Sequence, residues 1–311
     1  MWQPNAPRDK RICSPRDRES ASSLGLDGGP SPGLPPRGSI KISGHIDIRV
    51  NISDYRQVKS HVQHIECFHL SLLRMLEARL NRANWVVKGG VNLRAWFGSR
   101  RCSEDLDLDV IKCAQHVLRE RFDKVLLSRP LAEVLTTQGL EITRISKPKQ
   151  TDTTQRWKIE LKAAAVSVPL HTKVEFSRRG TRDEEYALEP VRPDIVRPYG
   201  IPAPTANHYT ARSAIRQKIQ ALAGRSETQA RDVWDLDHLF RTTNADPRPL
   251  PREVPAILPE AVERAVSLGY DMFKAQVVPY LSEEDQTIYG TRDAWDRMCE
   301  LVAERLEEFQ S

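Results

Sequence analysis

The chain has 311 residues, enough for about two domains of ordinary size. Hydrophobic residues make up 39% and charged residues 29% of it, which is typical of a globular protein and excludes a membrane protein or a coiled coil. The formal net charge of +5 is small for this length, so binding of nucleic acid would require a local cluster of cations.

The N-terminal segment predicts a disordered tail over residues 1–44. Residues 1–40 contain 18 Pro, Gly and Ser residues, and the apolar side chains between them show no periodicity. Such a segment buries too little apolar surface to offset the conformational entropy that folding would cost. Residues 1–41 carry seven Lys and Arg against four Asp and Glu, so much of the net positive charge lies in this tail.

The sequence also predicts the compartment. No stretch approaches the roughly 20 apolar residues of a membrane span, and the N-terminus lacks the apolar core of a signal peptide. Five cysteines form an odd set without a CxxC pair, which argues against a disulfide framework and a structural zinc site. We therefore expect a cytoplasmic protein with reduced thiols and no membrane association.

The first predicted elements alternate between strand and helix. Residues 45–49 fit a short strand, and apolar residues over 62–80 recur at three- and four-residue spacing, which predicts an amphipathic helix. The apolar run 84–87 then stops at Lys88-Gly89-Gly90, the pattern of a strand that turns tightly into a helix over 91–97. Glycine allows the backbone to approach a phosphate, and a helix N-terminus favours an anion, although a Gly-Gly pair alone is better explained as a plain turn.

Residues 105–110 alternate strictly between aspartate and apolar residues, as on a strand with one buried face. Side by side on such a strand, two carboxylates about 4 Å apart repel by roughly 4 kcal/mol at an effective dielectric near 20. Either exposure to water or a bound cation would compensate for this repulsion. Mg²⁺ prefers carboxylate and phosphate oxygens, and carboxylates that share it can hold the phosphates of a nucleotide.

The preceding strand–turn–helix unit favours the metal interpretation of Asp105 and Asp107 over a solvated edge strand. A third carboxylate on a neighbouring strand would complete the site. Glu175 lies in the short alternating run 172–176, and we predict that it is this third ligand.

The remaining elements predict two parts of the chain. Residues 114–137 show helical periodicity, strand-like runs follow, and a proline-rich stretch over 190–204 indicates a domain crossover. We predict an α/β (α+β) domain over 45–195 and a helical domain over 205–311. In the first domain we predict strands near 140–146, 155–162 and 171–177. In the second we predict helices at about 208–223, 229–241, 259–281 and 291–309.

Charge is unevenly distributed along the chain. Residues 142–182 contain ten Lys and Arg against three Asp and Glu, which fits a surface that follows the phosphates of RNA. A solvated basic hairpin explains at least half of these charges as well. Trp157 in this segment would either stack on a base or be buried, and burial is the commoner outcome. Residues 283–308 contain nine acids against three arginines and would repel RNA.

Two segments resemble the signature of the AbiEii/AbiGii toxin family. The first combines 88–94 with 101–109, and the second combines Lys218 to Arg225 with 231–236. The two in this order are far more specific than either alone. The resemblance implies a nucleotidyltransferase-type mixed sheet with flanking helices, followed by a helical C-terminal domain that closes the nucleotide cleft.

The resemblance also implies roles for single residues. Asp105 and Asp107 match the metal-binding pair, and Lys218 matches the lysine that contacts phosphates. Asp232 matches the acid of an Arg-Asp motif, for which direct catalysis and support of Lys218 are equal alternatives. The predicted catalytic set is Asp105, Asp107, Lys218 and Asp232, the metal ligands are Asp105, Asp107 and Glu175, and the nucleotide contacts are Lys88, Gly89, Gly90, Arg94, Ser103 and Arg225.

By the same resemblance, the chain is expected to be a toxin with a cognate antitoxin protein, acting in phage defence by abortive infection. It would use Mg²⁺, or alternatively Mn²⁺, to transfer NMP from an NTP to RNA, in particular the 3′ end of tRNA, and release pyrophosphate. Two alternatives stay open. One is transfer to a small molecule or a protein hydroxyl, and the other is a nucleotide-binding module without catalysis.

Overall fold

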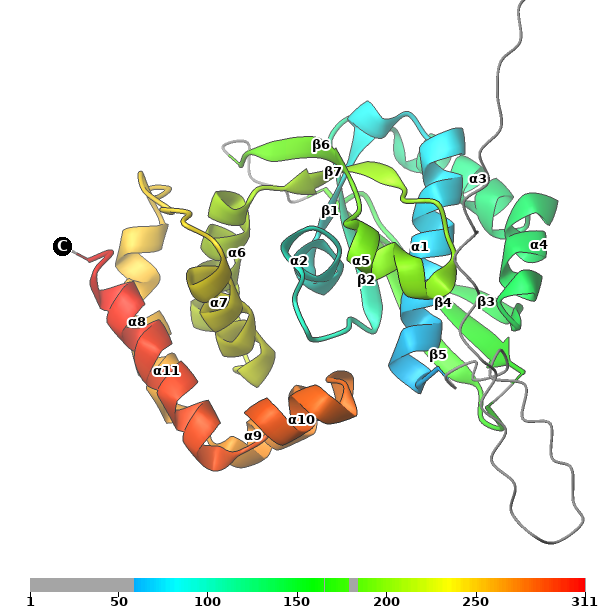
Figure 1. Ribbon diagram of the computed structural model, residues 1–311. Helices are drawn as coiled ribbons and strands as arrows, with labels where there is room; N and C mark the ends of the chain where they lie inside the picture. The colour runs from blue at the N-terminus through cyan, green and yellow to red at the C-terminus, as the bar shows by residue number, and fades with distance from the viewer. Residues whose placement is uncertain (1–58, 165, 179–183, 311) are drawn as a thin grey trace, which may run out of the picture. The chain divides into compact units, whose positions relative to one another are not determined.

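A mixed seven-stranded sheet forms the centre of the computed structural model, which describes residues 59–164, 166–178 and 184–310 (Figure 1). The strand order is β3-β4-β5-β2-β1-β7-β6. The central strand β2 pairs parallel with β5 and antiparallel with β1. The strands are β1 (Trp85–Lys88), β2 (Asp105–Val110), β3 (Leu140–Gln150), β4 (Thr154–Ala163), β5 (Leu170–Ser177), β6 (Tyr186–Pro190) and β7 (Thr205–Tyr209).

Five helices accompany the strands, and six follow them within the described ranges, so the predicted fold class is confirmed. The predicted tail 1–44 and strand 45–49 lie outside the described residues. The first helices are α1 (His61–Arg79), α2 (Gly89–Phe97), α3 (Gln115–Leu126), α4 (Arg129–Thr137) and α5 (Pro193–Val196). The later helices are α6 (Ala211–Gly224), α7 (Ala230–Thr242), α8 (Val254–Ser267), α9 (Tyr270–Gln276), α10 (Glu283–Tyr289) and α11 (Arg292–Glu307).

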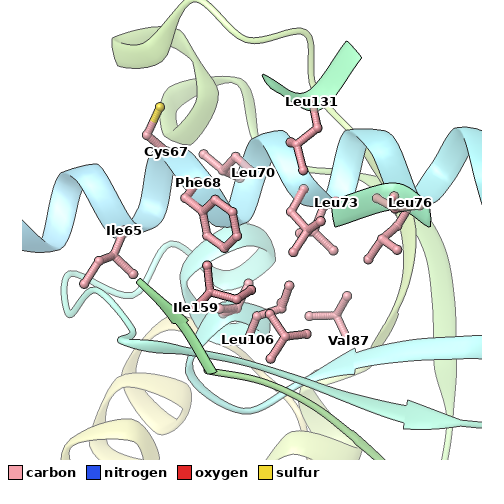
Figure 2. Packing of buried hydrophobic residues seen from close by; sticks show 14 of the residues in the cluster. Ile65, Cys67, Phe68, Leu70, Leu73, Leu76, Val87, Leu106, Leu131 and Ile159 are labelled. Carbon is pink, nitrogen blue, oxygen red and sulfur yellow. The ribbon is translucent and has the colours of Figure 1, made fainter. Parts of the chain in front are cut away.

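Helix α1 covers one face of the sheet, as its apolar stripe predicts. Ser60 begins the helix with a capping box, in which Gln63 and Ser60 satisfy each other's backbone N–H groups. Figure 2 shows Leu73 and Leu76 of α1 pointing towards Val87 of β1 and other side chains of the sheet. All three side chains are fully buried, so this contact fixes α1 on the sheet.

A second hydrophobic core joins the C-terminal helices. Trp295 of α11, Phe273 of α9 and Leu236 of α7 lie in it, and each is fully buried. Helix α2 packs against β1 and β2 and also against α6 and α7, so it connects the sheet to these helices (Figure 1). The chain from Arg56 onward forms one compact unit. No helix among the described residues is long and apolar enough to cross a bilayer.

The structure corrects two of the predicted elements and adds helix α10. The helix predicted over 259–281 is divided into α8 and α9, because Leu268 and Gly269 are extended between them. Strand β7 covers the start of the helix predicted over 208–223, and α10 was not predicted. Since β7 is almost entirely buried and β6 almost entirely exposed, neither strand shows the alternation that predicts a half-buried strand. Helix α6 therefore begins at Ala211 rather than at 208.

Candidate active site

The three aspartates of β2 lie in two different environments. Asp109 is buried, pairs with Lys88 across 2.6 Å and accepts a hydrogen bond from the hydroxyl of Tyr209 at 2.8 Å. Asp105 and Asp107 are partly exposed, while the leucines between the aspartates are fully buried. The apolar face of β2 therefore fixes the strand, and its first two aspartates remain accessible.

Glu175 lies beside Asp107, as the predicted third carboxylate requires. The parallel register of β2 and β5 places Asp107 opposite Glu175 and Asp105 opposite Lys173. Two cations accompany these carboxylates: Lys173 Nζ lies 2.8 Å from Asp105 Oδ2, and Arg156 lies 2.6 Å from Glu175 Oε2.

Asp107 differs from its neighbours because it has no hydrogen-bond or ion-pair partner within the described ranges. Burial raises the pKa of Asp107 above its ordinary value, and the charges of Asp105 and Glu175 raise it further. Nearby lysines oppose this shift without cancelling it. Of the carboxylates of Asp105, Asp107 and Glu175, that of Asp107 is thus the one without a cation partner among the described residues.

The Gly-Gly turn brings the start of α2 against these carboxylates. Gly89 adopts a left-handed conformation with φ of 67°, and a Cβ atom there would lie 3.4 Å from Asp107 Oδ2. At Gly90, a Cβ atom would lie 2.7 Å from Ser103 Oγ, so Ser103 would have to shift to admit any side chain. The backbone conformation at Gly89 and the space at Gly90 therefore both favour glycine where α2 approaches β2.

A cavity of about 470 Å³ is lined by residues of the sheet and of the C-terminal helices, among them most of the predicted site residues. From the predicted set it brings together Gly89, Gly90, Ser103, Asp105, Asp107, Glu175, Lys218 and Arg225. The remaining lining residues are Arg101, Glu104, Arg156, Lys173, Gln229, Arg231, Ala275, Gln276 and Tyr280.

Behind the cavity, a buried ionic network holds its cations. Lys218 Nζ lies 2.9 Å from Asp232 and 2.5 Å from Asp235, while Arg225 Nε lies 2.7 Å from Asp232. Arg101 contacts Asp235 at 3.2 Å. Both aspartates are completely buried. Burial alone would lower the pKa of Lys218, but the two carboxylates raise it above its ordinary value, so this lysine stays charged at neutral pH.

Three residues of the predicted set do not line the cavity. Asp232 lies behind it, where it contacts Lys218 and Arg225. Lys88 pairs with Asp109 and lines an adjoining hollow. Arg94 pairs with Glu66 of α1 at 2.6 Å and donates to the carbonyl of Ser99, so it connects two helices outside the cavity, and its contact with the nucleotide stays a prediction.

Several residues of the cavity were not predicted. Arg231 is the clearest case, because it is the cation of the cavity without a carboxylate partner among the described residues. Lys173 lies two residues before Glu175, so strand periodicity alone places both on the same face. Gln276 and Tyr280 come from α9 and the 3₁₀ turn Val278–Tyr280, and no pattern in the sequence points to them.

Trp157 does not reach the cavity. It is fully buried, packs against Phe122 and Phe176, and donates a hydrogen bond to Asp123 at 2.9 Å. Burial rather than base stacking is therefore confirmed for this tryptophan.

The carboxylate face has the donor chemistry of a divalent metal site. Asp107 has no cation partner, and Asp105 and Glu175 are each neutralised by one side chain. Hard cations such as Mg²⁺ and Mn²⁺ prefer oxygen ligands of this kind. In the described ranges, no three His, Cys, Asp or Glu side chains are arranged as a metal cage. Asp105, Asp107 and Glu175 are the residues that would hold such a cation, and Lys173 and Arg156 would compete with it for Asp105 and Glu175.

Comparison with known proteins identifies the same region. A family described as nucleotidyl transferase AbiEii toxin of type IV toxin–antitoxin systems matches residues 71–302. The crystal structure of JHP933 from Helicobacter pylori is similar at 18% identity and a TM-score of 0.52, covering 80% of this chain and 95% of that chain. The toxin MenT4 (Rv2826c) from Mycobacterium tuberculosis H37Rv, a nucleotidyltransferase, is similar at 19% identity and a TM-score of 0.52, covering 80% and 86%. No curated protein sequence matches the chain.

Proposed function

Because the chain belongs to the AbiEii family of nucleotidyltransferase toxins, we propose that it transfers NMP from an NTP to an RNA hydroxyl and releases pyrophosphate. The observation that carries this proposal is the shared cavity. The carboxylates Asp105, Asp107 and Glu175 and the cations Lys218 and Arg225 all line it. Carboxylates that can hold a divalent cation, together with cations that can neutralise phosphate charge, support the transfer of a nucleotidyl group.

In the proposed reaction, the hydroxyl oxygen of the acceptor attacks the α-phosphorus of the NTP. The bond between that phosphorus and the bridging oxygen breaks, pyrophosphate leaves with the electron pair, and the hydroxyl proton passes to the carboxylate cluster. Asp105, Asp107 and Glu175 would hold a divalent cation, whose positive charge would stabilise the transferring group. Lys218 and Arg225 bind the phosphates of the NTP, and buried Asp232 holds both cations in position.

A second hollow supports an RNA acceptor. It measures about 560 Å³ and shares Glu104, Asp105 and Lys173 with the catalytic cavity. Arg144 and Lys158 also line it, and neither has a carboxylate partner within the described part of the chain. Free cations that lead to the carboxylates fit the phosphates of an incoming nucleic-acid strand. The 3′ end of tRNA is the specific acceptor that we propose.

The family belongs to type IV toxin–antitoxin systems, so its members act together with an antitoxin. For this chain, we propose that the reaction takes place in the cytoplasm and stops translation during phage infection. Growth of cells that express the chain, with and without the neighbouring reading frame, tests this setting.

Transfer itself is tested with the full chain, Mg²⁺, an α-labelled NTP, and total RNA or total protein. We expect label in RNA and release of pyrophosphate, and we expect Asp105→Ala to abolish both while the protein stays folded. Asp296→Asn changes an exposed aspartate of α11 and serves as the control that retains transfer. Label in protein or a small molecule would contradict the RNA acceptor, and NTP binding without pyrophosphate release would contradict catalysis.

A further inference from the structure

An additional hollow adjoins the catalytic cavity on the side of α6. It measures about 360 Å³, at the lower end of the usual range for small-molecule sites. Gly89, Asp107, Lys218 and Arg225 line both this hollow and the catalytic cavity. A ligand whose phosphates lie at these four residues can therefore extend into either space.

The two spaces differ in chemistry. The catalytic cavity is lined mostly by charged side chains. The adjoining hollow is lined by Leu93, Ala214 and Ala221, of which Ala221 is partly exposed and the other two are buried, and by Gln217 and Gln220, whose amides are partly exposed. Its one internal ion pair, Lys88 with Asp109, is already satisfied. Aliphatic surface together with neutral donors and acceptors suits a flat heteroaromatic ring, whereas a phosphate would gain little there.

A single face of α6 carries both kinds of residue. Residues three or four positions apart lie on the same side of a helix. The hollow is lined from this face by Ala214, Gln217, Lys218, Ala221 and, at the helix end, Arg225. The cations that we assign to the phosphates therefore lie directly beside the neutral part of the hollow.

Gln217 is the residue of this face whose side chain is able to form hydrogen bonds with a ligand. Its side chain is partly buried, and it has no hydrogen-bond partner among the described residues. Gln220 differs, because its amide donates to Glu253 at 3.3 Å. An amide that is partly removed from water and unpaired offers one donor and one acceptor to a base edge.

We propose that this hollow is the nucleobase subsite, in which Gln217 forms hydrogen bonds with the edge of the base and Ala221 contacts its face. The subsite rests on the proposed function in one respect, namely that the triphosphate lies at Lys218 and Arg225. Gln217 is thus a specificity residue that acts on binding and takes no part in the chemical step.

Binding measurements test the subsite without requiring turnover. The affinities of the four NTPs and of inorganic tripolyphosphate are measured by calorimetry in the presence of Mg²⁺, for the full chain and for two variants. We expect Gln217→Ala to weaken the tightest NTP about fivefold, the effect of one lost hydrogen bond, and to leave tripolyphosphate unchanged. Ala221→Phe fills the hollow and should weaken every NTP more than it weakens tripolyphosphate.

Three outcomes would overturn the subsite. Equal losses for NTP and tripolyphosphate would mean that Gln217 acts through Lys218. Unchanged NTP affinity in both variants would place the base elsewhere. A selective loss in Gln229→Ala instead would place it in the catalytic cavity, which Gln229 lines. Failure of the proposed transfer is distinguishable, because the parent chain would then bind NTPs with a base preference and release no pyrophosphate.

Discussion

Substitution of Asp232 separates the two roles that its position allows. Asp232 is completely buried and contacts Lys218 at 2.9 Å and Arg225 at 2.7 Å. If it positions these cations, then Asp232→Asn should raise the KM for NTP and leave kcat within a few-fold of the parent value. If Asp232 reacts directly, kcat should fall by orders of magnitude while KM stays unchanged.

The same network sets the expected cost in stability. It contains three cations, Lys218, Arg225 and Arg101, and two carboxylates, Asp232 and Asp235. Removing Lys218 leaves each carboxylate with one arginine, whereas removing Asp232 leaves three cations around one carboxylate. We therefore expect Asp232→Ala to lower the free energy of unfolding by about 3–5 kcal/mol, and Lys218→Met to lower it by much less.

Urea unfolding of the two single variants and of the double variant measures this asymmetry. The double variant leaves two arginines with the one carboxylate of Asp235, which is one buried cation fewer than in Asp232→Ala alone. We therefore expect the double variant to recover part of the stability that Asp232→Ala loses. Equal losses for Lys218→Met and Asp232→Ala would refute the charge argument. A parent-like kcat and KM in Asp232→Asn would refute both proposed roles.

Three further predictions concern single residues of the site. Since the pKa of Asp107 is raised in the folded chain, its negative charge destabilises the fold at a pH above the ordinary carboxyl range. Asp107→Asn should therefore abolish transfer and raise Tm at neutral pH, whereas the control Asp296→Asn should leave both unchanged. A lowered Tm for Asp107→Asn would contradict this reasoning. Lys173→Ala removes the cation that competes for Asp105, so Mn²⁺ should bind more tightly in calorimetry, and weaker binding would speak against a metal at this face. Arg94 contacts Glu66, which also accepts a hydrogen bond from Tyr199. Arg94→Ala should therefore lower the midpoint of urea unfolding and leave NTP affinity unchanged. An unchanged midpoint would be inconsistent with this structural role.

The loss of folding stability at acidic pH depends in part on Asp235. Burial raises the pKa of this carboxyl, but Arg101 and Lys218 outweigh burial and hold it below its ordinary value. A depressed carboxyl pKa stabilises the fold above the pKa of the unfolded chain, near 3.9 for aspartate, and this contribution is lost as pH falls through the folded value. The ionic network is thus at its strongest at neutral pH, where Lys218 is also charged.

Local sequence patterns predicted the strand that carries Asp105 and Asp107 and the helix that begins at Gly89. The alternation over Asp105–Val110 and the glycines that begin α2 each depend on neighbours within a few residues, so the chain alone carries that information. The pairing of Asp107 with Glu175 needed a guess about strand order, and the register of β2 and β5 agrees with it. Arg94 shows the limit of this approach, because its place beside the glycines says nothing about Glu66, which lies 28 residues earlier in the chain.

The sequence by itself determined the fold class and the family, because hydrophobic periodicity and short motifs are local properties. The same alternation set Asp105 and Asp107 on one face of a strand. Only the tertiary structure decided which charges meet. It pairs Asp105 with Lys173 and Glu175 with Arg156, and it brings Tyr280 to the cavity from a distant turn. Such contacts depend on strand register and helix packing, where a shift of one residue turns a side chain to the opposite face.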